Sequence, residues 1–145
     1  MFRERIAVFP HFVKKFFYDH DISKLNLDIN KTQAKILMLI NENNDKSMSE
    51  ISLIAGLEKS SFTRSVDYLV SMGFITRNQT KNDRRITKLS FTEKGSRAVD
   101  ILRNDFDFYW ESLISGFSED EKKEFFESLE TISKYLNKMI TGKQK

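Results

Sequence analysis

Residues 47–73 determine the fold that we expect, and their sequence is SMSEISLIAGLEKSSFTRSVDYLVSMG. Ser47 and Glu50 have the spacing of a capping box, in which each side chain accepts a hydrogen bond from the other residue's backbone amide. A short helix therefore begins here, and Gly56 suits the left-handed conformation that commonly ends a helix. A second helix is expected from about Lys59 to Ser71. Two helices joined by a short, glycine-containing turn have the outline of a helix-turn-helix.

A basic hairpin is expected directly after this stretch. Residues 74–79 and 86–92 are rich in Ile, Thr and Phe and have the character of strands. Residues 80–85 are polar and basic, and we expect them to form the tip of the hairpin. From Thr76 to Ser90 the chain carries five cations and one carboxylate, a net charge of +4.

Long helices are expected on both sides of this central region, because the 145 residues include one proline and five glycines. Capping signals at Asn30–Gln33, Thr92–Gly95 and Ser118–Glu121 mark three helix starts, the first for a helix from about 31 to 41. Two heptad-like apolar seams lie near the chain ends. The first comprises Phe2, Ile6, Phe9, Val13 and Phe16, and Pro10 must either start or kink the helix that carries it. The second comprises Phe125, Leu129, Ile132, Leu136 and Met139. The predicted fold class is mainly α with a small β-hairpin (α+β).

Composition excludes several classes of protein. There is no cysteine, so neither a disulfide framework nor a thiol redox switch is available, and 39% hydrophobic residues supply a sizeable core. No stretch approaches a membrane span or a secretory signal, so we expect a single soluble, cytoplasmic domain. Catalytic motifs are absent, and we expect no enzyme, cofactor or metal. His20 lies between Asp19 and Asp21, but such a run is expected to be a capped, solvated helix end.

The charge distribution and the helix-turn-helix together indicate DNA binding. The net charge of the chain is +3, but residues 100–130 carry ten acids and three bases, in contrast to the basic hairpin. The second helix of a helix-turn-helix lies in the major groove, with its N-terminal residues nearest the base edges. Here those residues are Lys59, Ser60, Ser61, Thr63 and Arg64. The basic hairpin is expected to reach an adjacent minor groove, whose negative potential attracts arginine.

The motifs in the central region resemble the MarR family of winged-helix bacterial transcriptional regulators. The resemblance is carried by SEI at 49–51, KSSFTR at 59–64, GFITR at 73–77, DRR at 83–85 and LSFTEKG at 89–95. It implies a winged helix-turn-helix lobe at 31–95, with helices at 1–24 and 96–145 forming the base of a homodimer. The dimer would bind a palindromic operator in double-stranded DNA. Leu53, Ile54 and Glu58 depart from the family pattern, Glu58 because glutamate is a poor N-cap.

The resemblance also implies roles for the hairpin. Asp83 would hold Arg85 as Arg85 enters the minor groove, and Arg84 would contact a phosphate, although the two arginines could exchange roles. The candidate DNA-binding residues are Ser49, Lys59, Ser60, Ser61, Thr63, Arg64, Arg77, Lys81, Asp83, Arg84 and Arg85.

The expected function is sequence-specific DNA binding by a transcriptional regulator, with repression as the expected action and activation as the alternative. The resemblance implies a small aromatic effector between base and lobe. Phe16, Phe17, Tyr109 and Trp110 are candidates for its cleft, with packing in the core as the preferred role. The alternative to DNA binding is a winged-helix protein-interaction module, because a fold does not fix a function.

Overall fold

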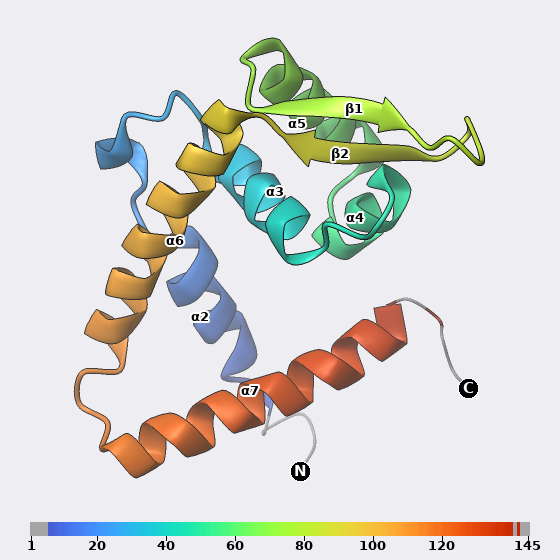
Figure 1. The fold of residues 1–145 in the computed structure, drawn as a ribbon. Helices are drawn as coiled ribbons and strands as arrows, with labels where there is room; N and C mark the ends of the chain where they lie inside the picture. The colour runs from blue at the N-terminus through green and yellow to red at the C-terminus, as the bar shows by residue number, and fades with distance from the viewer. Residues whose placement is uncertain (1–5, 141, 143–145) are drawn as a thin grey trace.

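The computed structural model describes residues 6–140 and 142, and it is mainly helical with one small antiparallel sheet (Figure 1). The predicted fold class is therefore confirmed. In chain order the elements are α2 (Phe9–Val13), η1 (Lys14–Tyr18), η2 (Ser23–Leu25), α3 (Lys31–Glu42), α4 (Met48–Ala55), α5 (Lys59–Ser71), β1 (Ile75–Gln79), β2 (Thr87–Phe91), α6 (Glu93–Leu113) and α7 (Glu119–Ile140).

Side-chain caps fix the starts of four helices as the sequence predicts. Asn30 and Gln33 form a capping box at α3, and Ser47 and Glu50 form one at α4. Thr92 accepts a hydrogen bond from the Gly95 amide at α6. At α7, Ser118 and Glu121 exchange hydrogen bonds of 2.8 and 3.2 Å. Because each cap is local in sequence, these boundaries follow from short motifs.

The helix-turn-helix has the predicted form. Gly56 ends α4 with φ of 63°, the left-handed conformation that glycine adopts without strain. The next helix, α5, spans the predicted residues Lys59–Ser71, and its N-cap residue Glu58 makes no capping hydrogen bond through its side chain. The departure noted at Glu58 thus has a structural consequence, because the first turn of α5 lacks a side-chain acceptor.

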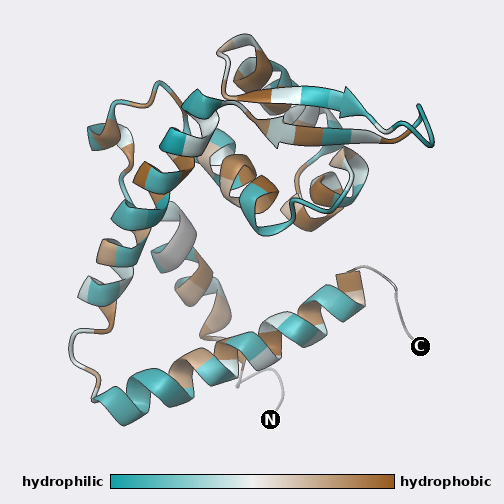
Figure 2. Ribbon diagram, in the orientation of Figure 1, coloured by the Kyte–Doolittle hydropathy of each residue, from teal (hydrophilic) through white to brown (hydrophobic). Residues whose placement is uncertain are grey.

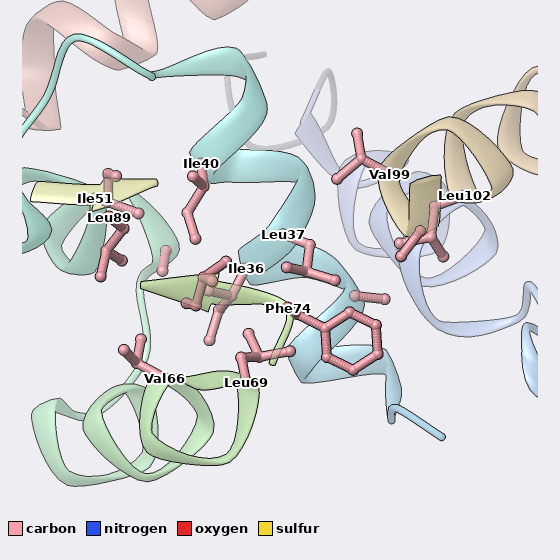
Figure 3. Packing of buried hydrophobic residues seen from close by; sticks show 14 of the residues in the cluster. Ile36, Leu37, Ile40, Ile51, Val66, Leu69, Phe74, Leu89, Val99 and Leu102 are labelled. Carbon is pink, nitrogen blue, oxygen red and sulfur yellow. The ribbon is translucent and has the colours of Figure 1, made fainter. Parts of the chain in front are cut away.

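One hydrophobic core holds α3, α4, α5, the hairpin and the first half of α6 together (Figure 3). Phe62 and Phe74 are its largest fully buried side chains. Its labelled members are Ile36, Leu37, Ile40, Ile51, Val66, Leu69, Phe74, Leu89, Val99 and Leu102. Val99 and Leu102 belong to α6, so the core of the lobe extends past residue 95.

The hairpin pairs β1 with β2 in antiparallel register, from Ile75 opposite Phe91 to Gln79 opposite Thr87. Phe74 precedes β1, whereas the sequence placed it within the strand. Its amide donates to Leu69 O at 2.9 Å, and its carbonyl accepts from Thr92 N at 3.0 Å. These bonds join the end of α5 to the start of α6.

Of the remaining helices, α6 leaves the lobe, and α7 contacts α4 of the lobe. From the sheet, α6 runs down past α2, and α7 crosses beneath both (Figure 1). Pro10 lies in the first turn of α2, so it starts this helix. Of the predicted N-terminal seam, Phe2 and the side chain of Phe16 lie outside the described residues. No described helix is both long and apolar enough to cross a membrane.

Aromatic side chains join α2, α6 and α7. The ring of Phe125 lies 6.4 Å from Phe12 of α2 and 6.1 Å from Trp110 of α6. Farther along α7 the predicted seam is uncovered, with Leu136 47% and Met139 76% exposed. Hydropathy colouring shows apolar residues recurring along this helix (Figure 2).

Candidate nucleic-acid interface

The outer face of α5 begins the candidate interface. Helical periodicity places Ser60 and Arg64 opposite the buried Phe62 and Val66. Lys59, Ser60 and Arg64 are exposed, whereas Ser61 and Thr63 are half-buried on the flanks of this face. Two cations and small hydroxyls thus share the N-terminal half of the helix, a combination that suits phosphate and base-edge contacts.

Helix α4, which precedes α5, is attached to α3 by a hydrogen bond. Ser49 is exposed in the first turn of α4, next to the capping residue Glu50. Lys35 of α3 donates from Nζ to the Ala55 carbonyl at 2.9 Å, where α4 ends. This bond satisfies a terminal carbonyl of α4 and ties the turn between α4 and α5 to α3. Of the other two departures from the family pattern, Leu53 is 57% exposed and Ile54 is half-buried.

The hairpin tip is organised by Thr80 and Asp83. Thr80 Oγ1 donates to the Asp83 carbonyl at 2.7 Å, and Asp83 Oδ1 accepts from the Arg85 amide at 2.9 Å. The same Oδ1 lies 3.8 Å from Arg85 Nε, so the implied contact of Asp83 with Arg85 is present. The Arg85 side chain is nevertheless 95% exposed, which leaves the guanidinium accessible to an anion.

Other cations of the hairpin, which we call the wing, and of α5 are also exposed. Lys81 and Arg84 are exposed at the hairpin tip. Within residues 6–140 and 142, no ion pair holds Lys59, Arg64, Lys81 or Arg84. Unpaired, solvated cations on one lobe are the usual electrostatic footprint of a surface that binds nucleic acid.

Arg77 is placed differently from the other candidates. Its guanidinium lies 2.6 Å from Oδ1 of Asp67 on α5, and its side chain is 34% exposed. The structure therefore brings Arg77 to the face of the hairpin that lies against α5. The alternation of side chains along β1 indicates this placement, because Arg77 shares the face of Ile75 and lies opposite the buried Leu89.

A cavity of about 290 Å³ is lined by residues of α3 and α6 together with His20 and Ile22. Its apolar wall comes from both helices and includes Met38 and Phe106, and three of its polar residues are Lys31, Lys35 and Glu42. Burial raises the pKa of the Glu42 carboxyl above its ordinary value. Neither Tyr109 nor Trp110 lines this cavity, and the side chains of Phe16 and Phe17 lie outside the described part.

His20 lines this cavity, and its burial corrects the prediction of a solvated helix end. It is 8% exposed, not solvated, because the chain after η1 folds back against α6. Its Nε2 lies 2.6 Å from Asp105 Oδ2, and Lys24 Nζ lies 3.1 Å from Oδ1 of the same carboxylate. The His20 ring also packs against Tyr109, with centroids 4.2 Å apart. Burial raises the pKa of Tyr109, and the Asp19 carboxylate adds to this effect.

The segment from His20 to Asn30 also contacts α5. Tyr68 of α5 donates its hydroxyl to the Asp28 carbonyl at 2.6 Å. Earlier in the N-terminal segment, the Lys15 carbonyl of η1 accepts a hydrogen bond of 2.6 Å from the Tyr109 hydroxyl of α6. Helices α5 and α6 are thus both attached to the N-terminal segment. No periodicity signals these contacts, because their partners are 40 and 94 residues apart.

A three-helix lobe whose second and third helices form a helix-turn-helix, followed by a basic hairpin, defines the chain as a winged helix-turn-helix protein. Residues 29–87 match the model of the MarR family. Over these residues, which are less than half of the chain, the sequence resembles members of this family.

Two relatives are named transcriptional regulators. The HTH-type transcriptional regulator BilQ of Clostridioides difficile is 29% identical over 96 residues, which are 66% of this chain and 65% of BilQ. The match thus spans slightly less than two thirds of that relative. The uncharacterized HTH-type transcriptional regulator YfiV of Bacillus subtilis is 28% identical over 117 residues, covering 80% of this chain and 73% of YfiV.

Solved structures share the fold over nearly the whole chain. A MarR transcriptional regulator from Methanosarcina mazei superposes with a TM-score of 0.74 at 20% identity, covering 94% of this chain and 96% of the other. A MarR family regulator from Listeria monocytogenes, complexed with a 26mer DNA, superposes with a TM-score of 0.71 at 20% identity. Coverage is 97% of this chain and 91% of that one.

Proposed function

We propose that this chain is a transcriptional regulator that binds double-stranded DNA with sequence specificity as a homodimer. The observation that carries the proposal is the set of accessible cations and hydroxyls on one winged lobe, from the outer face of α5 to the hairpin tip. Helix α5 would enter the major groove and supply Ser60 and Arg64 to base edges. The wing would place Arg85, or Arg84 in its stead, in the adjacent minor groove.

Surface area supports the homodimer. A compact 17.1 kDa monomer is expected to expose about 7,750 Å². The chain exposes 10787 Å², and α7 has no buried residue among those described. This excess suits one subunit of an interlaced pair, in which a partner would cover the apolar side chains of α7, including Leu136 and Met139.

The operator follows from this symmetry. A two-fold dimer presents two recognition helices to half-sites about one helical turn apart, so the binding site is palindromic. Occupancy of a promoter by such a dimer would repress transcription. The names of the relatives and the Listeria monocytogenes complex with DNA support regulation through DNA binding.

We further propose that a small aromatic effector occupies the cavity between α3 and α6. Phe106 and Met38 offer apolar contact, while Lys31 and Lys35 would favour an anionic substituent. Because α3 lies within the lobe whereas α6 runs from the lobe toward the base, an occupant of this cavity would shift one relative to the other. Such a shift would change the spacing of the two recognition helices.

The test is selection of bound sequences from a random duplex library, followed by titration of the enriched duplex against salt. We expect the enriched sequence to be palindromic. We also expect affinity to fall steeply as the salt concentration rises, since each neutralised phosphate releases counterions. Arg85→Ala should weaken binding and leave the dimer intact. Lys123→Ala is the matched control, because it removes an exposed cation from α7 and should leave binding unchanged.

Two outcomes would reject the proposal. A library without enrichment would favour the protein-interaction alternative. If Arg84→Ala and Arg85→Ala both bind as tightly as the wild type, the wing makes no contribution and its assignment is wrong.

A further inference from the structure

The wing and the recognition helix are joined by one ion pair. Arg77 of β1 places its guanidinium nitrogen 2.6 Å from Oδ1 of Asp67 on α5, a distance that makes this a charge-assisted hydrogen bond. Between these residues the chain passes through only the end of α5 and the turn at Met72–Phe74. The pair therefore closes a short loop that contains the junction of helix and hairpin.

Both side chains have defined positions in the candidate interface. Asp67 lies one turn after Arg64, on the same outward part of α5, and its side chain is 56% exposed. Arg77 lies on the inner face of the hairpin, opposite Leu89 in the register. By contrast, Thr76 and Asn78 lie on the outer face, where Asn78 Nδ2 donates to Ser90 Oγ at 3.0 Å.

We propose that Arg77 is a positioning residue that fixes the wing relative to the recognition helix, and that it makes no phosphate contact of its own. The inference rests on the proposed DNA binding, because the wing matters for affinity only if it enters a groove. Arg77 also neutralises Asp67, a carboxylate on the helix face that would approach the negatively charged duplex. This function separates Arg77 from Arg84 and Arg85, whose side chains point into solvent at the hairpin tip.

The effect of breaking the pair is a loosened hairpin. Exposed ion pairs contribute little to stability, so we expect the hydrogen-exchange protection of the β1 and β2 amides to fall about twofold to fivefold in Arg77→Gln. Asp67→Asn should give the same loss, and the double variant should lose no more than either single variant, because all three break one interaction. Amides of α3 serve as the internal control.

Salt titration distinguishes positioning from direct contact. For Arg77→Gln we expect operator affinity to fall about twofold to fivefold, with the slope of log affinity against log salt unchanged. Arg84→Ala is the comparison, since loss of a phosphate contact should reduce that slope by about 0.9. A slope reduced by a similar amount in Arg77→Gln would overturn the proposal.

Hydrogen exchange keeps this test independent of the proposed function. If the wild type selects no duplex, the DNA-binding proposal fails, but the exchange comparison still decides whether the pair holds the wing. Unchanged protection of β1 and β2 in both Arg77→Gln and Asp67→Asn would show that it does not.

Discussion

Gly95→Ala is expected to destabilise the protein, although alanine is the better helix former. Gly95 lies in the first turn of α6 and is buried against the carbonyl of Phe74. A Cβ added there would lie far inside contact distance of Phe74 O, 2.9 Å from Phe74 C and 3.0 Å from Phe91 Cδ1. Ordinary contacts begin near 3.5 Å, so α6 would have to move by about 0.6 Å or more.

The magnitude follows from three contributions. Alanine in place of glycine would stabilise the helix by about 1 kcal/mol. Forced overpacking costs about 1–3 kcal/mol. The shift would also stretch the bonds from Thr92 Oγ1 to the carbonyls of Gly73 and Phe74, now 2.6 and 3.1 Å, each worth about 1 kcal/mol. The net loss is about 2–4 kcal/mol, and the clash outweighs the gain in propensity.

Thermal and urea unfolding at one fixed protein concentration measure this loss, because the proposed dimerisation would make the transition concentration-dependent. We expect the melting temperature to fall by about 6–12 °C. Gly116→Ala is the matched control, since a Cβ at Gly116 meets nothing within 4 Å. Its stability should change by less than about 1 kcal/mol. A Gly95→Ala protein as stable as the wild type would refute the close packing of α6 on Phe74.

Three further variants probe the core, a cap and the dimer. Phe62→Ala empties a fully buried site and should reduce the free energy of unfolding by about 3–5 kcal/mol in urea, and a loss below 1 kcal/mol would contradict its burial. Glu58→Ser supplies the missing N-cap of α5 and should add about 0.5–1 kcal/mol, so an unchanged urea midpoint would argue against this cap geometry. Leu136→Glu should yield monomers in sedimentation, whereas a dimer as stable as that of Lys123→Glu would exclude the α7 face from the interface.

Local signals account for most of what the sequence predicted. The capping boxes at Ser47–Glu50 and Ser118–Glu121 each involve residues three apart, so their geometry is encoded within one helical turn. The bounds of α5 followed from the glycine before it and from the apolar spacing of Phe62, Val66 and Leu69. The wing followed from its change to strand-like composition.

Contacts between distant segments were not predictable in this way. His20 was expected in solvent, but it pairs with Asp105, which lies 85 residues away. The Asp–His–Asp run resembles a helix end, and only the folding of residues 20–30 against α6 turns the imidazole inward. Arg77 was grouped with the DNA-binding cations because charge alone does not reveal its partner. The alternation within β1 gives the face of Arg77, but the identity of Asp67 requires the packing of β1 on α5.

The continuity of α6 has a consequence for folding cooperativity. Its first half contributes Ala98, Val99 and Leu102 to the core of the lobe, and its second half carries Trp110 into the aromatic cluster with α2 and α7. Helical propagation links the two halves, so one half cannot melt without fraying the other. The chain should therefore unfold in a single transition. A fragment ending at residue 95 would lack three core side chains, which makes the lobe a poor candidate for excision or for transfer to another protein.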